Sequence, residues 1–248
     1  MTKTSSPPRP AGPPGPAGPG MIEWLMSVAA GAELFADVPE STMYPAEARV
    51  VRSAGDERRR EFGTVRYCAR QALLRIGVPA APVLPDADGV PLWPTGVVGS
   101  MTHCAGYRAA AVAYATDLAG LGIDAEPHAP LPPSTLDLVL RDDERIEHLV
   151  LAQAYPRLHW DRLLFCAKEA VYKAWFPLTR RWLGFADVAL EVHPDGRFRA
   201  HLTVPAPTAA GLEMTRMDGR WAVGRGLIVA VATLGRPSHG RSVRTRSS

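Results

Sequence analysis

The chain has 248 residues, 46% of them hydrophobic, which is enough to build the core of one large domain or two small ones. It contains no run of about 18 apolar residues and no apolar N-terminal leader, so we expect no membrane span and a cytoplasmic location. Five of the 28 basic residues lie in residues 1–20 and 237–248, which hold no acidic residue, leaving 23 basic against 25 acidic groups between them. This near-neutral body argues against a nucleic-acid partner.

Both ends of the chain are predicted to lie outside the folded body. Residues 1–20 are rich in proline and glycine and are expected to be a disordered tail. Residues 237–248 are expected to be a flexible basic tail. The three cysteines (Cys68, Cys104 and Cys166) lack the spacing of a disulfide framework or a metal site and are expected to be reduced.

Apolar periodicity predicts the elements of the first half. A helical stripe covers residues 56–76, and a loop rich in turn-forming residues follows it. Three short strands come next, over residues 97–103, 108–115 and 121–126. The tight turns between them predict an antiparallel meander.

The second half repeats this order. Helices are predicted over residues 134–156 and 161–175, the second ended by Pro177. A hairpin turn is predicted at residues 194–196, and residues 220–234 supply two more strands. We therefore expect an α+β fold of two similar halves, residues 21–121 and 122–236, related by a pseudo-twofold axis with the active site at their junction.

Two acidic residues stand on the last strand of the predicted meander. Side chains alternate along a strand, so Asp124 and Glu126 share one face, with their Cα atoms about 7 Å apart. Two carboxylates so placed can share a hard cation such as Mg²⁺. The alternative is a solvent-exposed strand face without a ligand.

The helix predicted over residues 161–175 carries Lys168 and Glu169 in an apolar, aromatic setting. Desolvating a charge without a partner costs several kcal/mol, so a bound ion or ligand is a reasonable partner. Only three of the 28 basic residues are lysine, and Lys168 and Lys173 flank this glutamate. The alternative is a surface Glu169–Lys173 pair, which accounts for Lys173 but poorly for Lys168.

His103 ends the first strand of the predicted meander. With Arg58 and Arg66 of the preceding helix, it could donate hydrogen bonds to a phosphate. Taken singly, each of these side chains could equally be a solvated surface residue.

Three segments in order, GSMTHCAGYRAAAV, GIDAE and FCAKEAVYKAW, resemble the three motifs of the 4′-phosphopantetheinyl transferase superfamily. The likeness extends to RRREFGTVRYCARQAL and FPLTRRWLGF, and so covers most of residues 56–186. It points to the single-chain branch that serves peptide and polyketide synthases, as in siderophore (surfactin-synthetase-type) assembly. The resemblance implies two similar α+β halves in a monomer.

The resemblance also implies roles for individual residues. Asp124, Glu126 and Glu169 would bind Mg²⁺, with the main chain of Ala125 beside it. Other implied contacts to coenzyme A come from Arg58, Arg66, Thr102, His103, Lys173, the backbone near Leu183, and the loop Pro85, Asp86, Ala87 and Asp88. In relatives this loop often begins with a lysine, and here it does not, which puts a side-chain phosphate contact from it in doubt.

The implied reaction transfers 4′-phosphopantetheine from coenzyme A to a serine of an apo acyl, aryl or peptidyl carrier protein, releasing adenosine 3′,5′-bisphosphate. Asp124, Glu169 and Lys168 are the candidate catalytic residues, with Glu169 as base and Lys168 on the leaving phosphate. The carriers would belong to fatty acid, polyketide or nonribosomal peptide synthases. The alternatives are a Mg²⁺-dependent phosphodiesterase and a non-catalytic module that binds coenzyme A or a carrier.

Overall fold

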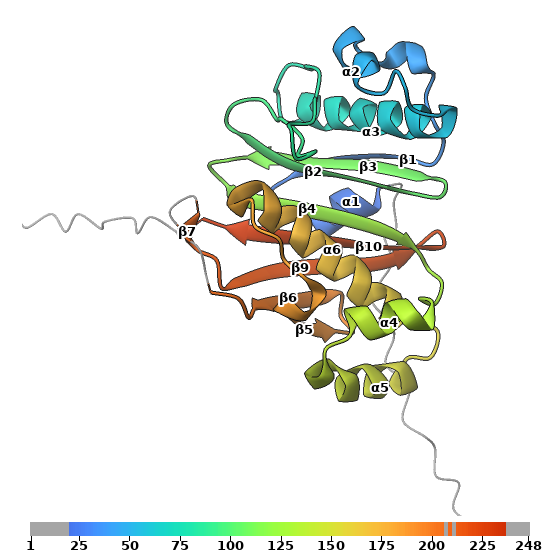
Figure 1. Cartoon of the computed structure of the whole chain (residues 1–248), viewed down its shortest axis with the longest axis vertical. Coiled ribbons are helices and arrows are strands. Elements are labelled where there is room, and N and C mark those ends of the chain that lie inside the picture. The colour runs from blue at the N-terminus through green and yellow to red at the C-terminus, as the bar shows by residue number, and fades with distance from the viewer. Residues whose placement is uncertain (1–19, 206–207, 210–211, 237–248) are drawn as a thin grey trace, which may run out of the picture.

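The computed structural model describes residues 20–205, 208–209 and 212–236. Two antiparallel sheets lie side by side, and one long helix packs on each (Figure 1). The first sheet has the order β1 (Ala30–Leu34), β3 (Tyr107–Tyr114), β2 (Val97–Cys104), and it is covered by α3 (Asp56–Arg75). The second has the order β4 (Leu118–Pro127), β10 (Leu227–Gly235), β9 (Arg216–Gly224), β6 (Arg197–Leu202), β5 (Val188–His193), and it is covered by α6 (Trp160–Thr179).

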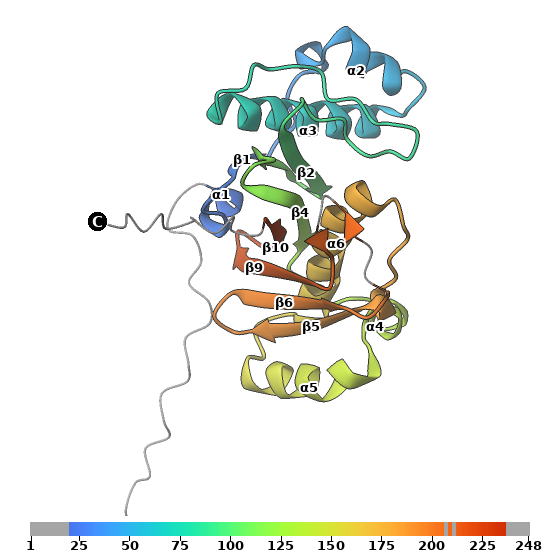
Figure 2. The same cartoon turned by 90° about the vertical axis from the view of Figure 1, so that its left-hand side faces the viewer.

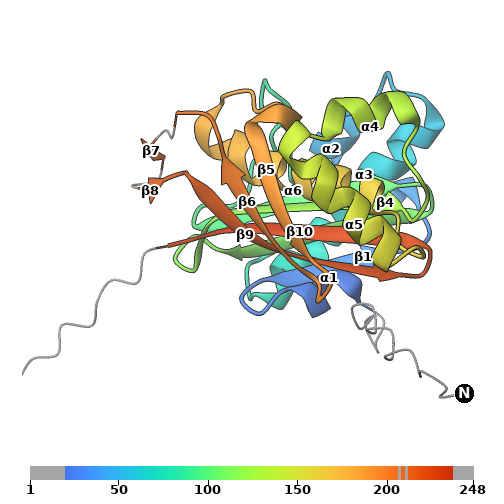
Figure 3. The same cartoon turned by 90° about the horizontal axis from the view of Figure 1, so that it is seen from below.

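Shorter elements complete the described part of the chain. They are α1 (Met21–Leu25), α2 (Pro45–Val50), α4 (Pro133–Val139), α5 (Arg145–Ala154), the two-residue strands β7 (Thr208–Ala209) and β8 (Leu212–Glu213), and single helical turns at Glu40–Thr42, Asp142–Glu144 and Phe185–Asp187. Helix α5 lies beyond β5 at the outer edge of the molecule (Figures 2 and 3). Within the described ranges, no helix has both the length and the apolar composition needed to cross a bilayer.

The predicted α+β class is confirmed, and each sheet carries one long helix as expected. The hairpin at residues 194–196 is also confirmed: β5 and β6 pair across it, and Gly196 has a φ of +89°. The two last strands are β9 and β10. Both predicted tails lie outside the described residues, except Gly20.

The predicted three-strand meander is wrong in its last strand. Strands β2 and β3 form a hairpin, but β4 pairs with β10 in the second sheet, more than 100 residues further along the chain. The expected boundary between residues 121 and 122 therefore falls inside a continuous strand. The turn after β3 suggested a meander, but turn residues do not determine which strand lies alongside the next one.

The predicted helix over residues 134–156 is two helices. The backbone is extended at Leu140 and Arg141. This break turns the carboxylate of Glu144 inward, where it accepts hydrogen bonds from the backbone N–H groups of Arg141 and Leu190. The sequence pattern indicated helix on both sides of this break but did not reveal the break itself.

The prediction that Pro177 ends helix α6 is wrong, because the helix continues to Thr179. It ends where Arg180 adopts a left-handed conformation with φ +54° and donates its N–H to the carbonyl of Phe176. A proline costs a helix one N–H bond and crowds the carbonyl four residues earlier. The helix continues for only two residues after Pro177, so this proline lies in its last turn.

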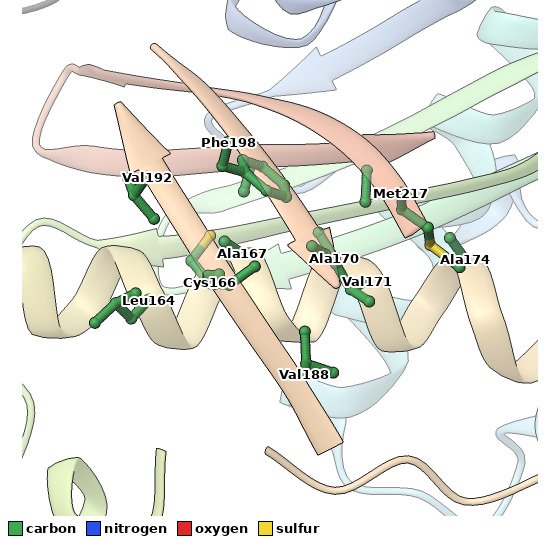
Figure 4. Packing of buried hydrophobic residues seen from close by; sticks show 14 of the residues in the cluster. Leu164, Cys166, Ala167, Ala170, Val171, Ala174, Val188, Val192, Phe198 and Met217 are labelled. Carbon is green, nitrogen blue, oxygen red and sulfur yellow. The ribbon is translucent and has the colours of Figure 1, made fainter. Parts of the chain in front are cut away.

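Helix α6 packs directly on β4 through two glycines. A Cβ on Gly122 would overlap the carbonyl oxygen of Ala170 and lie 2.6 Å from the backbone nitrogen of Ala174. A Cβ on Gly120 would lie 3.0 Å from the side chain of Leu178 and 3.2 Å from the carbonyl oxygen of Ala174, which is tight but less close than at Gly122. Across the same sheet, α6 also buries small and apolar side chains against β5, β6 and β9 (Figure 4), including Ala167, Ala170, Val171, Val188 and Phe198.

We predict that Gly122→Ala destabilises the fold by about 1–3 kcal/mol, because the added methyl group must push α6 away from β4. The thermal midpoint should fall by about 2–4 °C for each kcal/mol. Gly55→Ala is the control, since nothing lies within 4 Å of a Cβ there. Equal midpoints for the two variants would contradict this account of the helix–strand contact.

Candidate active site

The two sheets meet where β2 runs beside β4, and side chains of β2 hold them together. Ser100 Oγ accepts the backbone N–H of Ile123 at 3.0 Å. Thr102 Oγ1 donates to Asp124 Oδ1 at 3.1 Å. The predicted alternation on β4 is confirmed, because Leu121, Ile123 and Ala125 all point into the core on the opposite face. Asp124 therefore lies at the junction of the halves.

Lys173 of α6 reaches the same carboxylate. Its Nζ lies 2.7 Å from Asp124 Oδ1 and 3.4 Å from Thr102 Oγ1. Burial lowers the pKa of Lys173, but Asp124 and then Glu169 oppose this, and the net effect is a raised pKa. The ammonium group thus stays charged.

Glu126 also has a cationic partner, which the sequence analysis missed. Arg162, in the first turn of α6, donates from Nη1 to Glu126 Oε2 at 2.9 Å. It also donates to the carbonyls of Ala129 and Pro130, which fixes its guanidinium group. Its position seven residues before Glu169, two helical turns away, was the available signal.

The three predicted carboxylates share one electrostatic environment. Burial raises the pKa of Glu169, and Asp124 and Glu126 raise it further, while Lys173 lowers it. Burial and Asp124 likewise raise the pKa of Glu126, against the effect of Arg162 and Lys173. Such a set of carboxylates favours a further cation nearby.

The chemistry of these donors fits Mg²⁺, which prefers carboxylate oxygens. The buried Asp124 Oδ2 has no hydrogen-bond partner among the described residues, so it is available to an ion. In the described part of the chain, no three His, Cys, Asp or Glu side chains converge in a metal-ligating arrangement. Ala125 stands opposite Val229 in the β4–β10 ladder, and its main-chain contact with a metal stays a prediction.

A cavity of about 380 Å³ lies between α3, β2 and α6. The three carboxylates are not among its lining residues, but Lys173, which binds Asp124, is. Five of the predicted residues line this cavity: Arg58, Arg66, Asp88, His103 and Lys173. Its walls also include aromatic rings, with Tyr172 stacked on Phe176 at 5.4 Å and Arg66 lying 3.4 Å above the ring of Phe62. Cations and aromatic faces together suit a ligand with both phosphate groups and a planar ring.

Arg66 is held firmly in this wall. Its Nε donates to the carbonyl of Val83 at 3.3 Å, and burial lowers its pKa to about 10. Glu47 opposes this shift and Arg58 adds to it. The guanidinium group is therefore charged at neutral pH and only partly compensated, which favours an anion.

The structure brings other predicted residues only partly to this cavity. In the loop of residues 85–88, only Asp88 lines it. Arg180 binds both acidic residues of the loop, at 2.6 Å from Asp86 and 3.1 Å from Asp88. Thr102 contacts Asp124 rather than the cavity, and Leu183 is buried in the core of the second half.

The structure does not bring Lys168 to the cavity. Its side chain is 1% exposed, and its Nζ donates to Glu144 Oε2 at 2.8 Å and to the carbonyls of Val139 and Phe185. Lys168 and Glu169 diverge by about 100° around the helix axis. The partner that the sequence argument required for Lys168 is thus a buried glutamate, and the side chain fastens α6 to the segment between α4 and α5.

A second cavity, of about 480 Å³, lies elsewhere, between the segment 25–29 and strands β6, β9 and β10. None of the predicted site residues lines it.

Comparisons with known proteins agree with the motifs. The sequence model described as the 4′-phosphopantetheinyl transferase N-terminal domain matches residues 46–113, and that of the 4′-phosphopantetheinyl transferase superfamily matches residues 120–226. The boundary between the two matched segments, residues 113–120, lies at the turn from β3 to β4.

Curated relatives cover most of the chain. It is 50% identical over 218 residues to the 4′-phosphopantetheinyl transferase Svp of Streptomyces mobaraensis, covering 86% of this chain and 89% of the relative. It is 47% identical over 211 residues to PptT of Mycobacterium tuberculosis, covering 83% and 92%. It is 32% identical over 198 residues to enterobactin synthase component D of Salmonella typhi, covering 77% and 79%.

The chain therefore belongs to the 4′-phosphopantetheinyl transferase superfamily, and it is an enzyme of that class.

We predict that Lys168→Met destabilises the fold by about 3–5 kcal/mol, because it leaves the buried Glu144 charged and without its cationic partner. Urea unfolding measures this. Arg197→Met is the control, because it removes an exposed ion pair with Asp195 and should leave the unfolding midpoint unchanged. A Lys168→Met variant with unchanged stability and lost turnover would instead support the catalytic role.

Proposed function

We propose that this chain transfers the 4′-phosphopantetheine group of coenzyme A to a serine of an apo carrier protein and releases adenosine 3′,5′-bisphosphate. The observation that supports it most is the position of Lys173. Its ammonium group binds Asp124 and also lines the cavity that holds Arg58, Arg66 and His103. A diphosphate at Lys173 would extend its adenosine end along the two arginines, His103 and the aromatic walls.

The chain's own residues would mainly position the substrates and balance charge, as phosphoryl transfer requires. The serine oxygen forms a bond to the phosphorus bearing the pantetheine arm, and the bond from that phosphorus to the oxygen of the departing bisphosphate breaks. Glu169 accepts the serine proton on a carboxylate oxygen. Burial and the neighbouring Asp124 raise the pKa of this carboxyl group, which favours proton acceptance, whereas a bound Mg²⁺ would lower it.

Asp124, Glu126 and Glu169 would hold Mg²⁺, beside the main chain of Ala125. When bound, the ion would neutralise charge that develops on the phosphate oxygens. Lys173 and Arg162 already neutralise part of the carboxylate charge. These two cations would hold the Asp124 and Glu126 side chains in place before the ion arrives.

An exposed apolar stripe on α5 would receive the carrier. Ile146, Leu149 and Val150 follow the spacing of one helix face, and their exposed fractions are 76%, 67% and 58%. The buried pair of Lys168 and Glu144 fastens the start of α5 to the helix turn that carries Glu169. A carrier on the α5 stripe would thus dock on an element rigidly connected to the candidate base.

The class of carrier, the oligomeric state and the location are part of the same proposal. One relative is named as a component of an enterobactin synthase, which supports carriers of peptide or polyketide synthases, including those of siderophore assembly. A monomer fits a cavity that one chain completes from both of its halves. A cytoplasmic location belongs to this proposal because reduced thiols are typical of that compartment, and Cys68, Cys104 and Cys166 are free in the structure.

The direct test is the mass of an apo carrier incubated with this chain, coenzyme A and Mg²⁺. We expect the carrier to gain one phosphopantetheine group, and we expect Asp124→Ala to abolish the gain. Because this change leaves Lys173 without its carboxylate partner, the thermal midpoint should fall, but the variant should stay folded at the assay temperature. No gain with any of several carriers, together with coenzyme A binding, would favour the non-catalytic module. Hydrolysis of coenzyme A without a change in the carrier's mass would favour the phosphodiesterase.

We predict that replacing both Ile146 and Leu149 by serine raises the KM for the apo carrier on the order of tenfold, because docking would lose apolar contact. The KM for coenzyme A should stay unchanged. Leu74→Ser is the control, since Leu74 is 52% exposed on α3 in the other half. An unchanged KM for several carriers in the double variant would contradict docking on α5.

A further inference from the structure

Glu61 places a carboxylate among the cations of the cavity. It lies on α3, one turn after Arg58, and its side chain is only 19% exposed. Coulomb's law makes a negative charge there repel an anionic ligand. Because Glu61 weakens the attraction for an anionic ligand, we expect it to have a second, favourable role in the cavity.

The contacts of Glu61 indicate that this role is to hold neighbouring side chains in position. One oxygen, Oε2, lies 3.4 Å from His103 Nε2 and 3.8 Å from Arg58 Nη1. Arg58 Nη1 is in turn 3.4 Å from His103 Nε2. A single carboxylate oxygen thus gathers an arginine of α3 and a histidine of β2, which belong to different elements.

The other oxygen of Glu61 is held from behind. Oε1 lies 3.5 Å from Arg108 Nη2 on β3. The side chain of Arg108 is 8% exposed, and its Nε is 3.2 Å from Asp37 Oδ1, while its Nη1 donates to the carbonyl of Tyr107 at 2.9 Å. Glu61 is therefore fixed to the core of the first half and cannot turn away without breaking this contact.

We propose that Glu61 is a positioning residue that holds Arg58 and His103 in place for the 3′-phosphate of coenzyme A. This inference rests on the proposed function. The side chain of Arg58 is 53% exposed, so without Glu61 it would sample many rotamers. Fixing a long side chain in advance reduces the entropy that ligand binding must otherwise overcome.

Two physical accounts of Glu61 predict opposite changes in the affinity for coenzyme A when Glu61 is replaced by glutamine. If only net charge matters, Glu61→Gln makes the cavity more positive and tightens coenzyme A binding. If positioning matters, the same change loosens binding, because the neutral amide attracts Arg58 and His103 less than the carboxylate does. Lys173 and Arg108 also face His103, and the substitution leaves both unchanged.

The experiment measures the Kd of coenzyme A and of 3′-dephospho-coenzyme A by calorimetry for the wild type, Glu61→Gln and Glu57→Gln. Glu57 is the matched control, because it is exposed one turn earlier on α3 and loses the same charge. We expect Glu61→Gln to raise the Kd of coenzyme A about 5–10-fold. The Kd of the dephospho ligand, the thermal midpoint and kcat at saturating coenzyme A should change less than about twofold.

A second variant, Glu61→Asp, keeps the charge but withdraws the carboxylate by one methylene group. Positioning predicts that it also weakens coenzyme A binding, whereas a role of charge alone predicts wild-type affinity. An unchanged or tighter Kd in Glu61→Gln, or an equal loss for both ligands, would overturn the role assigned to Glu61. A wild type that binds neither ligand would overturn the proposed function, and this inference with it.

Discussion

The close packing of α6 on β4 sets the geometry of the site. Gly120 and Gly122 leave no side chain between the strand and the helix. Asp124 and Glu126 continue the same face of β4, so they lie beside α6 once the glycines have brought it near. Lys173 and Arg162 of α6 then reach these acids. A packing constraint in the core thus determines where the charged groups meet.

Charge pairing explains why neighbouring residues of α6 have different environments. Lys168 faces inward and is neutralised by Glu144 in the core of the second half. Glu169 faces the junction of the halves, where the nearby acids raise its pKa. The first pair fixes the helix to the segment between α4 and α5. Glu169 remains available for chemistry, and the Lys168–Glu144 pair holds the backbone that carries it in place.

Much of this site could be predicted from the sequence. Alternation along β4 placed Asp124 and Glu126 on one face, and the ordered motifs identified the superfamily that the comparisons later confirmed. Helix α3 and the hairpin at Gly196 also followed from local patterns. These features depend on residues close together in the chain, where periodicity and turn chemistry carry information.

Other features depend on which element covers a given face, and periodicity does not contain that information. The pairing of β4 with β10 and the burial of Lys168 against Glu144 are contacts of this kind. The apolar spacing of α5 predicted a helix, but a core-facing stripe and an exposed one look the same in sequence. The contacts of Glu61 with His103 and Arg108 were hidden for the same reason.

The most direct test of this account is a crystal structure of the chain with coenzyme A and Mg²⁺. We predict that the diphosphate lies against Lys173, on the side of the Asp124 carboxylate, with the adenosine end in the cavity between α3 and α6. Coenzyme A bound instead in the larger cavity beside β6 and β9, or a diphosphate remote from Asp124, would contradict it.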